Sequence, residues 1–174
     1  MDHQLPLGRS LQQSRYLHTY MTYHRPASFG DALRVLKDMR PEDKAEVQGM
    51  GYPLLHAPFG VLISEHATYF HDVDGSPAGM AGVVRLSPTE GQIWMLCTPL
   101  ITTKPITFVR GAKAWLKEVE QHYQMLWNLA DARNHVHHKL LKHLGFKALR
   151  TIPMGPESLP YFEIVKLCAY PQQV

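Results

Sequence analysis

Two apolar stretches joined by one long amphipathic stretch restrict the fold of this chain more than any other part of its sequence. Residues 91–98 contain the run Ile-Trp-Met-Leu, and residues 125–130 form a second apolar run. Between them, residues 105–123 place an apolar side chain at every third or fourth position, a spacing typical of an α-helix with one buried face. A strand, a crossover helix and a second strand predict a right-handed βαβ unit with parallel, adjacent strands.

The sequence before this unit predicts helices followed by an antiparallel hairpin. Short runs with period-2 or helical spacing are separated by Gly and Pro, which mark turns and helix ends. The predicted elements are a first strand near Met21, a helix over 29–39 capped by Ser28, a helix from Pro41 to about Gln48 ended by Gly49 and Gly51, a weak helix over 53–65 broken at Pro58 and Gly60, and strands over 67–73 and 78–87 joined by Asp74-Gly75.

The sequence after the unit predicts one more helix and two strands. The helix covers 134–144 and ends at Gly145, and the strands cover 147–152 and 161–169 on either side of a loop over 154–160. This order predicts an α/β domain of the α+β type. Its central sheet would be mixed, mostly antiparallel, of about six to seven strands with one parallel crossover and with helices on both faces. Residues 1–20 lack a sustained apolar period, so we expect an N-terminal arm over 1–20 and a single domain over 21–174.

Composition excludes several classes of protein. Apolar residues make up 45% and charged residues 19% of the 174 residues, which excludes disorder of the whole chain and fits one globular domain. No stretch of about 18 uncharged apolar residues is present, so we expect no membrane span. The first twenty residues lack the pattern of a secretory signal. Cys97 and Cys168 lie in apolar runs and are expected to be small buried hydrophobes of a protein in a reducing compartment.

Charge is distributed unevenly along the chain, whose net charge is +3. Residues 104–150 hold nine Lys or Arg (104, 110, 113, 117, 133, 139, 142, 147 and 150) against three acids (118, 120 and 131), or +6, which leaves about −3 for the rest. This asymmetry suits a polyanionic partner, although solvated helix faces explain it as well. Contact with nucleic acid is compatible with it, but no sequence-specific motif is present. Histidines 135, 137, 138 and 143 fall on or beside one helix and invite a metal site, but such a site needs further ligands and partners that orient them, and a polar helix face is the favoured interpretation.

The run from Asn134 to Phe146, which opens with Asn and closes with Leu-Gly-Phe, resembles the last helix of the GNAT family of acyl-CoA-dependent N-acetyltransferases. The resemblance covers about residues 21–170 and implies acetyl-CoA as cofactor. In that family a Gly-rich loop before the long helix holds the cofactor pyrophosphate on free N–H groups. Here the loop from Thr98 to Pro105 has no glycine, and only Thr102, Thr103 and Lys104 offer contacts to a phosphate.

The resemblance implies further roles, some of which this chain lacks. Asn134 is a candidate for contact with the cofactor, and also an N-cap by its own chemistry. The family commonly places a Tyr as proton donor for the thiolate where this chain has Leu141; Tyr123 and Tyr161 are possible substitutes. Candidates for a general base are Glu65, His66, His71 and Asp72, and no spacing selects one of them. We therefore assign no catalytic residue and no metal ligand.

Shorter motifs resemble a divergent phage branch of the GNAT fold that includes internal virion proteins of short-tailed phages. These are Asp31…Met39-Arg40…Asp43…Glu46, the run from Gln92 to Thr98, and the run from Trp127 to Asn134. The resemblance implies a structural or assembly protein inside the virion, made in the host cytoplasm, with other virion proteins or further copies of itself as partners and no cofactor. The alternatives are an active N-acetyltransferase that uses acetyl-CoA on a host or phage amine, and a module that binds CoA or nucleic acid without turnover.

Overall fold

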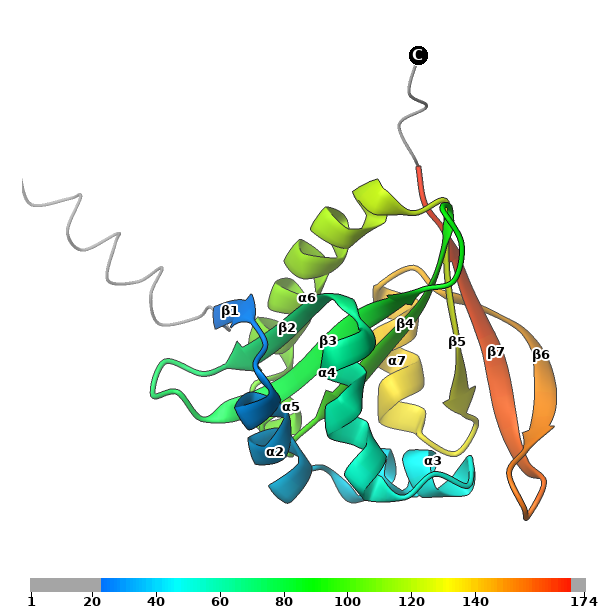
Figure 1. Cartoon of the computed structure of the whole chain (residues 1–174), viewed down its shortest axis with the longest axis horizontal. Helices are drawn as coiled ribbons and strands as arrows, with labels where there is room; N and C mark the ends of the chain where they lie inside the picture. Colours follow the sequence, from blue (N-terminus) through cyan, green and yellow to red (C-terminus); the bar gives the residue numbers. More distant parts are fainter. Residues whose placement is uncertain (1–22, 170–174) are drawn as a thin grey trace, which may run out of the picture.

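The computed structural model describes residues 23–169, which form one seven-stranded sheet flanked by helices (Figure 1). The strand order is β1-β2-β3-β4-β5-β7-β6, and every pair is antiparallel except β4 with β5. The strands are β1 (Tyr23–Pro26), β2 (Glu65–His71), β3 (Pro77–Arg85), β4 (Glu90–Cys97), β5 (Met125–Asp131), β6 (Lys147–Met154) and β7 (Leu159–Leu167). The predicted mixed sheet with one parallel crossover is confirmed.

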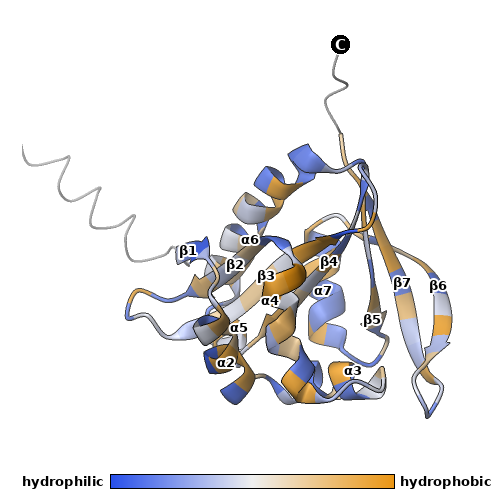
Figure 2. Cartoon of the chain, in the orientation of Figure 1, coloured by the Kyte–Doolittle hydropathy of each residue, from blue (hydrophilic) through white to orange (hydrophobic). Residues whose placement is uncertain are grey.

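Helices cover both faces of the sheet and enclose two apolar cores. They are α2 (Phe29–Lys37), α3 (Pro41–Gly49), the 3-10 helix η1 (Leu54–Phe59), α4 (Gly60–Ile63), α5 (Leu100–Thr103), α6 (Pro105–Val119), the 3-10 helix η2 (Glu120–His122) and α7 (His135–His143). Neighbouring residues of β2 point to opposite faces. Tyr69 packs with residues of α2 and α4, whereas Phe70 packs with residues of α6 and α7. Figure 2 shows a mixture of hydrophilic and hydrophobic residues along α6, as expected for a helix with one buried face.

The parallel strands β4 and β5 pair over only three residues and then diverge. Their register runs from Glu90 opposite Met125 to Gln92 opposite Trp127. Beyond this point β4 continues beside β3 as far as Cys97, and β5 continues beside β7. The sheet therefore opens into a V whose two arms are both hydrogen-bonded on their outer sides (Figure 1). The inner edges of the V need other partners, because a buried strand edge with unpaired backbone groups is costly.

Glycine is required where the two strands are still paired. A Cβ atom at Gly91 would lie 2.4 Å from Cγ1 of Val83 and 2.9 Å from the ring of Tyr123. Tyr123 is the residue after η2, and it is fully buried. The end of the crossover helix therefore packs directly on the closed end of the V. The point at which the strands diverge is thus fixed by close packing.

Several local predictions are confirmed and others are wrong. Ser28 caps α2 with a capping box, and Gly145 ends α7 with a φ of +86°. The segment predicted as a loop before the long helix contains the helical turn α5. The predicted loop over 154–160 is shorter, because β6 extends to Met154 and β7 begins at Leu159; Gly155, at φ +69°, makes the tight turn between them.

Side-chain burial also differs in part from the sequence-based expectation. Cys97 is buried as expected, but Cys168 is only half-buried. Trp115 is buried, whereas Trp94 and Trp127 are half-buried at the margins of the core. Within residues 23–169, none of the helices has both the length and the apolar character needed to cross a bilayer. The predicted arm over 1–20 lies outside the described residues.

Candidate functional site

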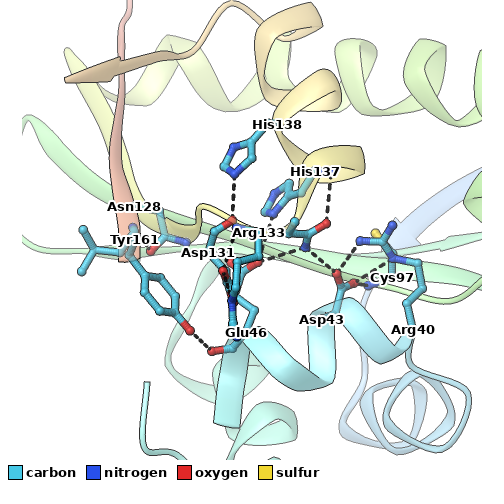
Figure 3. Close-up of polar contacts among 12 residues, drawn as sticks. Arg40, Asp43, Glu46, Cys97, Asn128, Asp131, Arg133, His137, His138 and Tyr161 are labelled. Atoms are coloured by element: carbon cyan, nitrogen blue, oxygen red, sulfur yellow. Dashed lines mark hydrogen bonds and ion pairs between the residues drawn. The ribbon is translucent and has the colours of Figure 1, made fainter. Parts of the chain in front are cut away.

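The open inner edge of β4 is covered by the first turn of α3 (Figure 3). The N–H of Thr98 donates to Ala78 of β3, so the backbone of the preceding residue, Cys97, points the other way, toward the gap left by β5. There the Cys97 N–H donates to a carboxylate oxygen of Asp43 at 2.7 Å, and the Cys97 carbonyl accepts from the N–H of Arg40 at 2.9 Å. Helix α3 therefore supplies the hydrogen bonds that a neighbouring strand would otherwise make.

Asp43 and Glu46 lie one turn apart on α3 and hold the first turn of α7. The Asn134 amide donates to the carboxylates of both residues, at 3.3 and 3.1 Å, while its oxygen accepts from the N–H of His137. The Nδ1 atom of His137 lies 3.4 Å from the Glu46 carboxylate. On the far side, the hydroxyl of Tyr161 donates to the Glu46 carbonyl at 2.6 Å. Asn134 is thus the predicted N-cap of α7 and also its link to α3.

Burial makes the charged side chains of this cluster depend on one another for stabilisation, because little water reaches them. The side chains of Arg40 and Asp43 form an ion pair and are only 4% and 5% exposed. Burial lowers the pKa of Arg40, but the hydrogen bond and charge of Asp43 outweigh it, so the guanidinium stays charged. Its Nη1 atom is buried without a hydrogen-bond partner among residues 23–169. A pair of this kind gives little net stability, yet loss of one partner leaves an uncompensated charge.

The pKa values of two further groups in the cluster are shifted. Burial lowers the pKa of His137, but the hydrogen bond and charge of Glu46 more than compensate, so its pKa lies above the ordinary value. Burial raises the pKa of Tyr161 to about 12, which keeps its hydroxyl protonated as a donor. The imidazole beside Glu46 therefore favours its charged form.

A cleft of about 270 Å³ opens beside this cluster, between α3, η1 and α4 on one side and β4 and β5 on the other. Glu46 and His137 line it together with Gln92, Trp94 and Asn128. The Gln92 amide donates to Asn128 across the divergent strands at 3.3 Å. The cleft combines a carboxylate, an imidazole and an aromatic ring, and its volume is near the lower limit for a small-molecule site.

The residues predicted to contact a phosphate lie on the turn α5 and at its end. The hydroxyls of Thr102 and Thr103 donate to the carbonyls of Pro99 and Leu100, at 2.7 and 2.9 Å. The Lys104 ammonium forms an ion pair with the Asp72 carboxylate, and the backbone N–H of Lys104 donates to the Leu100 carbonyl. Asn134 lies in the cluster with α3 instead, so these four predicted residues do not form one site.

The other candidates from the sequence lie away from the cleft. Glu65 pairs with Arg85, Asp72 with Lys104, and His66 stacks on His122. His71, between the rings of Tyr23 and Tyr69, does not line the cleft either. Leu141, at the position of the family tyrosine, is buried in the core. Within the described part of the chain no three His, Cys, Asp or Glu side chains are placed to hold a metal ion.

Sequence reasoning did not assign a site role to Arg40, Asp43, Glu46 or His137. The available signal was the spacing of Asp43 and Glu46, which places two carboxylates on one face of a helix. That spacing is ordinary on a solvated helix, and these carboxylates lie 88 to 91 residues from the Asn134 amide that they meet. Long-range contacts of this kind leave no local pattern.

No family model and no curated protein matches the chain. Solved structures do resemble it. A GNAT-family acetyltransferase from Bacillus anthracis shares 14% identity over 83% of this chain and 93% of its own, with a TM-score of 0.62. Ard1 from Thermoplasma volcanium shares 13% identity over 84% of this chain and 97% of its own, with a TM-score of 0.60. A phosphinothricin acetyltransferase from Sinorhizobium meliloti, solved in complex with AcCoA, shares 14% identity over 85% of this chain and 89% of its own, with a TM-score of 0.61. At this identity the likeness establishes the fold, a GNAT-like α+β fold.

Replacement of Asp43 by Ala should lower the free energy of unfolding by about 3–5 kcal/mol, because Arg40 and the Cys97 N–H lose their buried partner. Urea denaturation followed by circular dichroism measures the change. Glu42→Ala, an exposed acid of the same helix, should stay within about 0.5 kcal/mol of wild type. A cost below about 1 kcal/mol for Asp43→Ala would contradict this role of the ion pair.

The raised pKa of His137 makes its contribution to stability depend on pH. A base whose pKa is raised on folding stabilises the native state fully below its unfolded pKa of about 6.5, and this stabilisation is lost as pH rises through the folded pKa. His137→Gln should therefore destabilise the protein more at pH 6 than at pH 9 in urea denaturation. The lowered pKa of His66 affects both proteins equally and cancels in the comparison. An equal or reversed difference would show that Glu46 does not hold the imidazolium.

Proposed function

From the GNAT-like fold, we propose that this chain is a structural or assembly protein of a phage particle in which acetyl transfer has been lost. One observation carries the loss of activity: an acetyltransferase of this fold binds the cofactor arm along a strand edge, and at Cys97 the inner edge of β4 is already hydrogen-bonded to Arg40 and Asp43 of the same chain. The remaining arguments concern the pyrophosphate, the proton donor and the phage resemblance.

The residues present do not fit acetyl-CoA at its usual place in this fold. The pantetheine arm needs free backbone groups along the strand edge, and the Cys97 N–H and carbonyl have partners in α3. The pyrophosphate needs free N–H groups at a helix N-terminus. In α5 the N–H groups of Ile101, Thr102 and Lys104 donate within the turn, and α6 begins with Pro105, which has no N–H.

Proton transfer is impaired as well. Leu141, a buried residue of α7, has no proton to give to a departing thiolate. General acid–base catalysis typically contributes about 10²- to 10⁴-fold to the rate of an enzyme. The hydroxyl of Tyr161, one of the two possible substitutes, donates to the Glu46 carbonyl, and that of Tyr123 donates to Glu65. Both substitutes are therefore engaged.

The role in a phage particle is supported by the resemblance of short sequence motifs to a phage branch of this fold. Of the residues that carry part of that resemblance, Arg40 and Asp43 cover the edge of β4 at Cys97, and Asp43 and Glu46 hold the first turn of α7. In the proposed role the chain is made in the host cytoplasm and built into the virion. Its partners there are other virion proteins or further copies of itself, and it needs no cofactor.

A second candidate function is acetyl-CoA-dependent transfer to a host or phage amine. One observation favours it: a groove of about 480 Å³ between α6 and α7 carries Arg110, Lys113 and Lys139, which suit the phosphates of a nucleotide cofactor. The cleft with Glu46 and His137 would then receive the amine.

Purified protein should release no CoA from acetyl-CoA above the blank with a panel of amines and peptides, and millimolar acetyl-CoA should leave its melting temperature unchanged. A ligand at 100 times its Kd would add about 2.7 kcal/mol to the stability of the native state. An active GNAT acetyltransferase assayed in parallel is the positive control. Clear turnover that falls severalfold in Asn134→Ala or Lys104→Ala would replace this proposal with the second candidate.

Particles purified from the source phage should contain the chain at several copies each, measured by quantitative mass spectrometry. Protease added to intact particles should leave it uncut and should cut it after the particles are opened, because the proposed place is internal. Particles from a strain with the gene deleted are the control for specificity of detection. Absence of the chain from purified particles would exclude a virion role whatever the result of the acetyl-CoA assay.

A further inference from the structure

The groove between α6 and α7 combines an apolar floor with a basic rim. On α6 the lining residues recur with the spacing of one helical face, and on α7 they form a second stripe opposite. The lining residues are Ile101, Pro105, Ile106, Phe108, Val109, Arg110 and Lys113 from α5 and α6, and Val136, Lys139, Leu140 and His143 from α7. Ile106 and Val136 are 69% and 43% exposed. The groove thus leaves apolar side chains uncovered between two helices.

The charges of the groove all have one sign. Arg110, Lys113 and Lys139 line it together with His143, and no acidic residue is among the lining residues in the described part of the chain. Apart from Ile101, the lining residues belong to the segment 104–150, which carries a formal charge of +6. A ligand that covers the floor without leaving these cations unpaired must itself be apolar on one side and acidic along its margins.

We propose that this groove docks an acidic amphipathic helix of a partner protein. The proposal rests on the proposed assembly role, for which it names the chemistry of the partner. A helix laid along a groove of this kind inserts side chains spaced three and four residues apart into the apolar floor. Its flanking Glu or Asp side chains then lie beside Lys113 of α6 and Lys139 of α7, on opposite walls.

Nucleic acid fits this groove less well, although its charge is suitable. A phosphate backbone would pair with the cations but would leave Ile106 and Val136 exposed to water. Single strands are held largely by stacking of bases on aromatic side chains. Among the described residues that line the groove, Phe108 is the one Phe, Tyr or Trp, and at 3% exposure it is unavailable for stacking.

The probe for the test is a blocked, fluorescein-labelled peptide of 15 to 20 residues with Leu at helical spacing and Glu on the flanks. A matched peptide carries Lys in place of every Glu. In fluorescence anisotropy at low salt, the Glu peptide should bind the full-length protein at least about tenfold more tightly than the Lys peptide. Its affinity should fall severalfold when salt is raised, because the contacts on the rim are ionic.

Charge reversals separate the groove from general electrostatics. Lys113→Glu and Lys139→Glu should each weaken binding of the Glu peptide about fivefold or more. Lys142→Glu changes the net charge equally and lies exposed on the same helix as Lys139 but outside the groove, so it should change binding less than twofold. Circular dichroism confirms that the three variants fold alike.

Unlabelled acetyl-CoA and a 20-base-pair DNA duplex are added as competitors. Equal binding of the two peptides, no binding of either, or equal effects of all three substitutions would overturn the docking proposal alone. The same holds if the duplex displaces the Glu peptide more effectively than unlabelled Glu peptide does. Displacement by acetyl-CoA with loss of binding in Lys113→Glu would overturn both the docking proposal and the proposed function.

Discussion

The divergence of β4 from β5 creates the physical constraint on which the rest of the structure depends. Two parallel strands that separate inside a protein leave backbone N–H and C=O groups facing a gap, and such groups must find partners. In this chain Arg40, the N-cap of α3, and Asp43 in its first turn provide them at Cys97. This requirement draws α3 to the edge of β4, and α3 in turn holds α7 through Asn134 and is tied to β7 through the hydroxyl of Tyr161.

This arrangement favours specificity over net stability. An ion pair between Arg40 and Asp43 loses hydration that its Coulomb energy only partly returns, and one guanidinium nitrogen lacks a partner among the described residues. Apolar side chains of similar volume could fill the same space, but one in place of Asp43 could not accept a hydrogen bond from the Cys97 N–H. The polar cluster therefore fixes where α3 and α7 lie, while the two apolar cores on either face of the sheet supply most of the stabilisation.

Local chemistry explains which features the sequence predicted. The amphipathic spacing over 105–123 predicted the crossover helix and hence the parallel pair, and Asp74-Gly75 and Gly145 predicted a turn and a helix end because few residues adopt positive φ. The turn α5 was missed, since Thr and Pro after a strand are equally typical of a loop. The cluster was missed because the role of Asp43 and Glu46 depends on contact with Asn134, which is 91 and 88 residues away in the sequence.

Because the covering residues belong to the same chain, the backbone of Cys97 on the inner edge of β4 is satisfied by an intramolecular contact. A site filled by a diffusing ligand is occupied only in proportion to the concentration of that ligand, and the ligand stabilises the fold by the same measure. A tethered helix is present at an effective concentration that dilution does not change. The backbone of Cys97 is therefore covered as soon as the chain has folded, and it stays covered whatever the concentration of small molecules in the surrounding solution.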